Sequence, residues 1–138
     1  MIDHTGVTVS DLKRSRDFYR TALAPIGYEL LAEFAAAVTG GTDVAGFGVP
    51  PKADFWLARG SPNRPPVHVA FRVGERTLVD AFYGAARQAG GRDNGAPGPR
   101  PHYHEHYYGA FVLDFDGHNI EVVCHEPVPA APGRTAAR

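Results

Sequence analysis

The sequence predicts an α+β fold built from two similar modules, each a strand, a helix and then a run of short strands. Two observations carry this prediction. Strand-like and helix-like spacings of apolar residues alternate along the chain. The pattern of the first half then starts again after a stiff polar linker, RGSPNRPP, at residues 59–66. With 138 residues, 43% of them hydrophobic, the chain can bury the core of one domain.

The first module is expected over about residues 2–59. Ser10-Asp11 provides a capping residue and an acid for the start of its helix, and Pro25 and Gly27 end that helix. Residues 35–37, three alanines, give the next strand some helical character. In order, the expected elements are a strand at 2–9, a helix from Ser10-Asp11 to Pro25, and strands at 28–38, 44–49 and 54–58.

An internal repeat predicts the second module over about residues 66–126. A shift of 64 residues, without a gap, places chemically similar residues on each other. The matched pairs are His4 with His68, Val9 with Val73, Asp11 with Glu75, Phe18-Tyr19 with Phe82-Tyr83 and Gly27 with Gly91. Agreement at this many positions indicates a duplication. A single domain over residues 1–126 follows, with a disordered tail at 127–138.

The end of the second module reads as a hairpin. Asp-Gly at residues 116–117 lies between two β-rich runs and is a strong hairpin signal. Residues 114, 116 and 119 are most simply turn residues. Residues 90–101, rich in Gly and Pro, are expected to form turns.

The charge balance excludes several classes of function. The formal net charge is −1, without a basic stripe for nucleic acid or an apolar run of membrane-spanning length. The first residues lack the charged and apolar regions of a signal peptide. The single cysteine, Cys124, falls on an apolar strand face and indicates a buried thiol in a reducing, cytoplasmic compartment.

Three potential metal ligands fall on polar strand faces. His4 and His68 lie opposite the apolar side chains of their strands, and Glu121 lies opposite Ile120 and Val122. A carboxylate inside so apolar a strand needs a charged or metal partner. The duplication brings the three residues toward one concave surface. The alternative is that each histidine is structural and that Glu121 pairs with an arginine such as Arg72.

These residues resemble the vicinal oxygen chelate superfamily, which includes glyoxalase I, extradiol dioxygenases, fosfomycin-modifying transferases and bleomycin-resistance proteins. The matching motifs are HTGVTVSDLKRSRDFY, HVAFRV and LDFDGHNIEVV. The resemblance implies paired βαβββ modules that form a glyoxalase/bleomycin-resistance/dioxygenase-type half-barrel around a divalent metal ion. It further implies His4, His68 and Glu121 as metal ligands, and a homodimer.

The resemblance also limits the chemistry. The superfamily's fourth ligand position falls on Trp56, which cannot bind a metal, and this weakens the case for a glyoxalase I reaction. Two histidines and one carboxylate with open coordination positions suit Fe²⁺ or Mn²⁺, and Zn²⁺ or Ni²⁺ is also possible.

Residues 102–108, HYHEHYY, are candidates for proton transfer beside the metal. His102, His104, His106, Tyr107 and Tyr108 are the candidate catalytic residues. A His-rich exposed loop that binds adventitious metal or only caps the barrel is the alternative. Trp56 and Phe111 are candidates for an apolar wall of the substrate pocket, and Arg100 for holding an anionic group of the substrate.

The sequence therefore favours a small metal-dependent enzyme whose small-molecule substrate chelates the ion through two neighbouring oxygens. A dioxygenase-like reaction is the first expectation, because a three-ligand site leaves room for O₂ beside the substrate. Glyoxalase-like lyase or isomerase chemistry is the second. A non-catalytic drug-binding module of the bleomycin-resistance type is the alternative from a different class.

Overall fold

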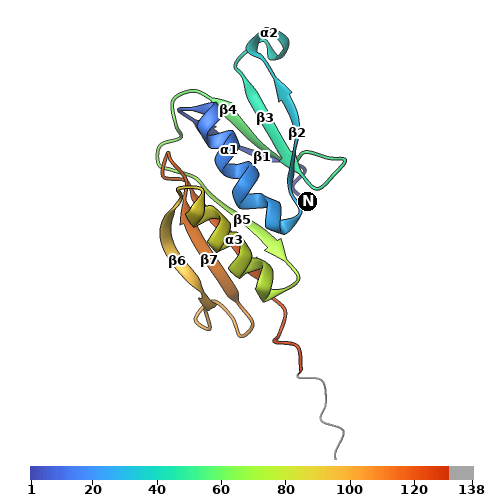
Figure 1. The fold of residues 1–138 in the computed structure, drawn as a ribbon, viewed down its shortest axis with the longest axis vertical. Coiled ribbons are helices and arrows are strands. Elements are labelled where there is room, and N and C mark those ends of the chain that lie inside the picture. The colour runs from blue at the N-terminus through green and yellow to red at the C-terminus, as the bar shows by residue number, and fades with distance from the viewer. Residues whose placement is uncertain (131–138) are drawn as a thin grey trace, which may run out of the picture.

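The computed structural model describes residues 1–130, which form two four-stranded mixed sheets with a long helix against each (Figure 1). The α+β prediction with two βαβββ modules is confirmed. Within the described residues, no helix is long and apolar enough to cross a membrane.

The first module follows the expected order closely. Its elements are β1 (Thr5–Val9), α1 (Leu12–Leu23), the 3₁₀ turn η1 (Ala24–Ile26), β2 (Glu29–Phe34), α2 (Ala36–Thr39), β3 (Val44–Gly48) and β4 (Phe55–Arg59). The strands lie in the order β1-β4-β3-β2, with β1 parallel to β4. The Asp11 side chain accepts the Arg14 backbone N–H at 3.1 Å and so caps α1. Gly27, at φ 86°, ends η1.

The ambiguous alanine stretch contains both kinds of structure. β2 ends at Phe34, and residues 36–39 then form the single turn α2 at the tip of the β2–β3 arm (Figure 1). Gly40, at φ 75°, closes this turn.

The second module repeats this topology. Its elements are β5 (His68–Val73), α3 (Arg76–Gln88), β6 (Arg92–Pro99), β7 (Tyr108–Leu113) and β8 (Asn119–Cys124). The strands lie in the order β5-β8-β7-β6, with β5 parallel to β8, and β7 and β8 form the predicted hairpin. Cys124 is a buried free thiol, as its position on the strand predicts.

The expectation of turns over residues 90–101 is wrong, because this segment contains β6. β6 is an edge strand that pairs only with β7, and its register shifts between Asp93 and Gly95 and again between Gly95 and Gly98. An edge strand tolerates proline and glycine, since one side of its backbone needs no partner strand. The composition therefore looks like a loop although the segment is paired.

The two modules share one core on the helix side of the sheets. α1 and α3 pack against each other, and Phe55 of β4 meets Phe71 of β5 with ring centroids 5.3 Å apart. Alternation along β1 and β5 sends Val7, Val9 and Val73 into this core. We call the opposite surface of each sheet, which carries no helix, its open face. His68 and Glu121 belong to the open face of the second module.

A polar contact network also joins the modules. The Asp114 carboxylate, in the β7–β8 turn, accepts the Tyr19 hydroxyl at 2.5 Å and the His118 backbone N–H at 2.9 Å. The buried His118 ring accepts the Val67 N–H through Nδ1 and donates to the Thr8 carbonyl through Nε2, both at 2.9 Å. We call Thr8, Tyr19, Val67, Asp114 and His118 the polar clasp. It ties the β7–β8 turn to both β1 and α1.

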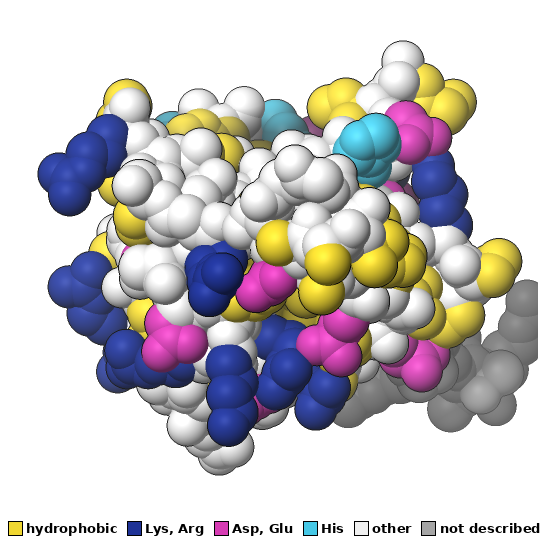
Figure 2. All heavy atoms as spheres, turned by 90° about the horizontal axis from the view of Figure 1, so that it is seen from above, with side chains coloured by type: hydrophobic (Ala, Val, Ile, Leu, Met, Phe, Trp, Pro, Cys, Tyr) yellow, Lys and Arg dark blue, Asp and Glu magenta, His cyan; other side chains and the backbone are white. Residues whose placement is uncertain are grey.

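Surface charges are mixed in sign. On the face shown in Figure 2, Lys and Arg side chains lie next to Asp and Glu side chains, in keeping with a net charge of −1. The expected tail begins without regular structure at residues 127–130. Residues 131–138 lie outside the described part of the chain.

Candidate functional site

Glu121 is the centre of the open face of the second module. The alternation of β8 points it away from Ile120 and Val122, which enter the core. In register, Glu121 lies between Ala70 of β5 and Phe111 of β7. Only 1% of Glu121 is exposed. A carboxylate this deeply buried requires hydrogen-bond or charged partners.

His68 and Tyr107 are those partners. His68 Nε2 lies 2.9 Å from Glu121 Oε1, and the Tyr107 hydroxyl donates to Glu121 Oε2. Burial, and then this hydrogen bond, raise the pKa of Tyr107 well above its ordinary value. Arg72, the alternative partner from the sequence, instead lies 3.6 Å from Glu126.

Gly109 makes room for the Tyr107 contact. A side chain at residue 109 would place its Cβ 3.2 Å from both Glu121 Oε2 and Tyr107 Cε1. The Tyr107 ring can therefore extend along β7 over Gly109 and reach the carboxylate. This contact shows that Tyr107, Gly109 and Phe111 lie on the open face, a choice of face that the sequence leaves undecided.

His4 lies in a separate group on the first module. Its Nδ1 is 2.7 Å from Asp3 Oδ1, and the Lys52 ammonium forms an ion pair with the same carboxylate. The Lys52 hydrogen bond first, and then that of His4, lower the pKa of Asp3. A carboxylate on one imidazole nitrogen is the usual way to orient a metal-binding histidine through its other nitrogen. His4 is thereby left with Nε2 for a further contact.

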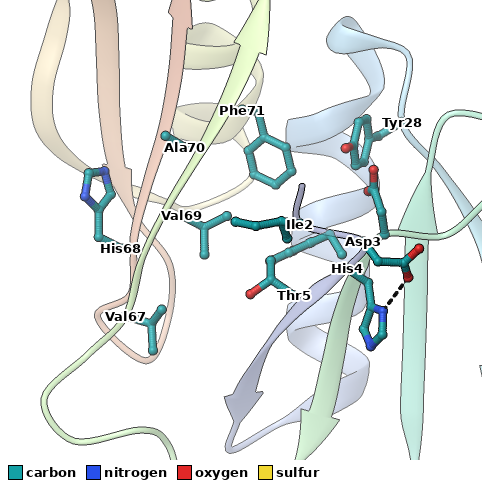
Figure 3. Close-up of a pocket in the computed structure, with 12 residues that line it drawn as sticks. Ile2, Asp3, His4, Thr5, Tyr28, Val67, His68, Val69, Ala70 and Phe71 are labelled. Atoms are coloured by element: carbon teal, nitrogen blue, oxygen red, sulfur yellow. Dashed lines mark hydrogen bonds and ion pairs between the residues drawn. The ribbon is translucent and has the colours of Figure 1, made fainter.

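One chain does not bring the three predicted ligands together. His4 and His68 border the same pocket between the modules, but Figure 3 shows their rings on opposite sides of it, pointing away from one another. Within residues 1–130 no group of three or more His, Cys, Asp or Glu side chains is arranged to hold a metal ion. His68 and Glu121 form a pair of donors, and His4 stands apart from them.

The five candidates of residues 102–108 have different surroundings. Tyr107 contacts Glu121, whereas Tyr108 points to the helix side and donates to Asp80 at 2.7 Å. His102 packs on Tyr103, with centroids 4.3 Å apart, and His106 lies 3.8 Å from Glu105. His104 Nε2 lies 2.6 Å from His125 Nδ1.

His125 is a neighbour of the site that the sequence does not single out. Its ring and that of His104 both pack against Tyr107, at centroid distances of 5.3 and 5.2 Å. Alternation is the sequence feature that indicates it, because residues 121, 123 and 125 fall on the same face of the strand. The histidine pair therefore borders the residue that holds Glu121.

The three substrate-binding candidates are also divided between the modules. Phe111 lies beside His68, with ring centroids 6.2 Å apart. The Arg100 guanidinium donates to the carbonyls of Ala96 and Gly98, each at 2.8 Å, so much of its hydrogen-bonding capacity holds β6. Trp56 lies on the open face of the first module.

Comparison with known proteins identifies the family. The sequence profile of the Glyoxalase/Bleomycin resistance protein/Dioxygenase superfamily matches residues 1–122. No curated protein matches the sequence.

Solved structures share the fold at low sequence identity. A glyoxalase/bleomycin resistance protein from Albidiferax ferrireducens T118 has a TM-score of 0.71 at 23% identity, covering 91% of this chain and 98% of that one. A glyoxylase/bleomycin resistance protein/dioxygenase domain from Frankia sp. EAN1pec has a TM-score of 0.70 at 19% identity, with coverages of 91% and 98%. The fosfomycin resistance protein FosX from Listeria monocytogenes, complexed with Mn(II) and sulfate, has a TM-score of 0.65 at 16% identity, with coverages of 91% and 93%.

Proposed function

The chain belongs to the Glyoxalase/Bleomycin resistance protein/Dioxygenase superfamily, and from that premise we propose that it is a metal-dependent enzyme acting on a small molecule with two neighbouring oxygens. The observation that carries the proposal is the contact between His68 and the buried Glu121. His68 Nε2 and Glu121 Oε1 face each other in a hydrogen bond of 2.9 Å, and a cation held by both atoms can replace that bond. FosX, a protein of the same fold, has a structure in complex with Mn(II), which supports a divalent metal ion as this cation.

The donor set fits a divalent ion of the first transition row. His68 and Glu121 would hold it together with a second imidazole. Two imidazoles with one carboxylate suit Fe²⁺ or Mn²⁺, and Zn²⁺ or Ni²⁺ is also compatible. When bound, the ion supplies a Lewis acid that stabilises an anionic oxygen of the substrate. Tyr107 fixes the orientation of the carboxylate through its second oxygen.

The third ligand in this proposal is His4 of a second copy of the chain. Since the His4 and His68 rings point apart within one chain, a homodimer that faces the first module of one copy toward the second module of the other can unite them. The Asp3 contact at Nδ1 leaves Nε2 of His4 for this role.

We assign proton transfer to residues 102–108, the loop next to Glu121. A tyrosine is ordinarily protonated near neutral pH, and the raised pKa of Tyr107 moves it further from ionisation, so it acts as a hydrogen-bond donor rather than as a base. The hydrogen-bonded pair of His104 and His125, which packs on the Tyr107 ring, is our candidate for proton transfer, because an imidazole can exchange a proton near neutral pH.

Metal titration of the purified protein by calorimetry tests the proposal. We expect His68→Ala and Glu121→Gln to weaken Mn²⁺ binding at least about tenfold. Glu126→Gln is the matched control, because Glu126 is an exposed acid beyond the end of β8. Wild-type metal affinity in both His68→Ala and Glu121→Gln would sink the proposal.

A mixing experiment tests the contribution of two chains. His4→Ala and Glu121→Gln homodimers each lack every complete site, whereas a mixed dimer regains one. After refolding the two variants together, we expect about a quarter of the wild-type number of sites to return. A return of none would show that the ligands come from within one chain, and metal sites that survive in the His4→Ala homodimer would show that His4 is no ligand.

Oxygen uptake separates the reaction classes. With Fe²⁺ supplied under air, consumption of O₂ on adding catechol favours a dioxygenase. Metal binding and substrate turnover without O₂ consumption favour a lyase or isomerase. A metal-free, drug-binding module is the second candidate function, favoured by the apolar Trp56 on the first module; it requires ligand binding that Glu121→Gln leaves unchanged.

A further inference from the structure

The open faces of the two modules carry different chemistry. The second module presents the His68 imidazole and the Tyr107 phenol around the Glu121 carboxylate. On the first module, Trp56 occupies the centre of the open face, with Gly6 of β1 and Gly46 of β3 as its register partners. The first module therefore offers an aromatic surface where the second offers polar donors.

The Trp56 indole lies flat on its own sheet. A side chain at residue 46 would place its Cβ 2.7 to 2.9 Å from three carbons of the indole six-membered ring. The ring thus covers the β3 backbone, and glycine at residue 46 is what allows it. Phe55 and Leu57, the neighbours of Trp56 along β4, are 1% and 0% exposed, but Trp56 keeps part of its surface open.

Phe34 extends this surface. Its ring plane is within 18° of the Trp56 plane, the centroids are 6.3 Å apart, and 44% of Phe34 is exposed. At that separation the two rings do not cover each other fully, so part of each π-face remains available. We call Trp56 and Phe34 the aromatic platform.

The strand positions in register with the aromatic platform are uncharged. In register, the strand positions beside Trp56 and Gly46 are Gly6 and Ala32, and Ala58 is the next open-face residue of β4. Glu33, the nearest acid on β2, forms an ion pair with Arg16 of α1 on the helix side. Within the described residues, these register neighbours therefore offer no charged side chain that would recognise an ion.

We propose that the aromatic platform binds a planar aromatic ring of the substrate. This inference deepens the proposed function, on which it rests for the chelating oxygens. Parallel aromatic rings favour a third ring in offset stacking, at centroid distances of about 4.5–7 Å. A saturated ligand of the same size gains burial of apolar area but no stacking, so the structure assigns the site an aromatic diol rather than an aliphatic one.

Trp56 reports directly on this contact, because it is the only tryptophan in the chain. The probes are naphthalene-2,3-diol and its saturated counterpart, decahydronaphthalene-2,3-diol, titrated with and without Mn²⁺. Calorimetry measures both affinities, and Trp56 fluorescence follows contact with the ring. We expect the aromatic diol to quench Trp56 and to bind about three- to tenfold tighter than the saturated diol.

Variants connect that preference to the aromatic platform. We expect Phe34→Leu to reduce the aromatic preference, and Trp56→Leu, followed by calorimetry, to abolish it. Val38→Ala is the matched control, because Val38 is an exposed apolar residue, 74% exposed, on the same β2–β3 arm. It should keep the wild-type preference.

Two outcomes overturn the inference. One is equal affinity for the aromatic and saturated diols in the wild type. The other is that Trp56→Leu and Phe34→Leu dissociate the dimer while both variants keep the preference for the aromatic diol. That result would assign the aromatic platform to contact between chains. An aromatic preference that persists without Mn²⁺, in a protein whose metal affinity Glu121→Gln leaves unchanged, supports the platform and refutes the proposed metal site.

Discussion

Replacing His118 by alanine tests the polar clasp between the modules. His118 is completely buried, and its ring accepts the Val67 N–H and donates to the Thr8 carbonyl. Alanine leaves a part-buried donor and a part-buried acceptor without partners, at about 1–3 kcal/mol each, and a cavity the size of an imidazole. Allowing for partial relaxation, we expect the free energy of unfolding to fall by about 3–4 kcal/mol.

Urea denaturation followed by circular dichroism measures this loss. His118→Asn separates the two bonds, because its shorter amide can accept the Val67 N–H but cannot reach the Thr8 carbonyl. We expect about half the loss of His118→Ala. His102→Ala, at an exposed histidine, is the control and should stay within about 0.5 kcal/mol of wild type.

A loss below about 1 kcal/mol for His118→Ala, with an unchanged denaturant slope, would contradict this prediction. It would mean that water or a backbone shift satisfies Val67 and Thr8 without the imidazole. A loss equal to that of His118→Asn would likewise show that the Val67 contact contributes nothing.

Three further predictions follow from individual contacts. Gly46→Ala places a methyl group against the Trp56 ring, so we expect a loss of about 1–2 kcal/mol in unfolding free energy and a red-shifted Trp56 emission; an unshifted spectrum would contradict the flat indole. Asp3→Asn removes the carboxylate at His4 Nδ1, and we expect calorimetry to show roughly tenfold weaker Mn²⁺ binding with an unchanged thermal melt; unchanged affinity would exclude this role. Folding raises the pKa of Tyr107, so the stability that its neutral form contributes is complete below about pH 10 and is lost as the pH rises further. Denaturation curves should therefore show a smaller loss of stability between about pH 10 and 11 for Tyr107→Phe than for the wild type. An equal loss in the two proteins would contradict this prediction.

Period-2 alternation explains how much of the site the sequence can predict. It places Glu121 opposite Ile120 and His68 opposite the apolar residues of its strand, and the structure shows these two side chains in contact. Alternation depends only on the pleat of the strand, which the local sequence controls. The contact between neighbouring strands then follows from their register.

The sequence indicates neither β6 nor the polar clasp, for different reasons. The composition of β6 is that of a loop, and an edge strand needs only one set of backbone partners, so its glycines and prolines do not exclude pairing. In the polar clasp, Asp114 and His118 satisfy the chemistry of a turn, and their second set of partners, on β1 and α1, lies about a hundred residues away in the chain. Local composition contains no record of such a long-range contact.

Whether His4 converges with the other two predicted ligands depends on a property that alternation does not contain. Alternation predicts which face of each sheet is polar, but it does not predict which faces of the two modules meet. In this chain the helix faces meet, through Phe55 and Phe71, and the polar clasp holds them there. Within residues 1–130, packing the modules by their helix faces leaves both open faces without an internal partner. The same duplication that places His4 and His68 at equivalent positions therefore separates them within one chain, and a site that uses both requires a second copy.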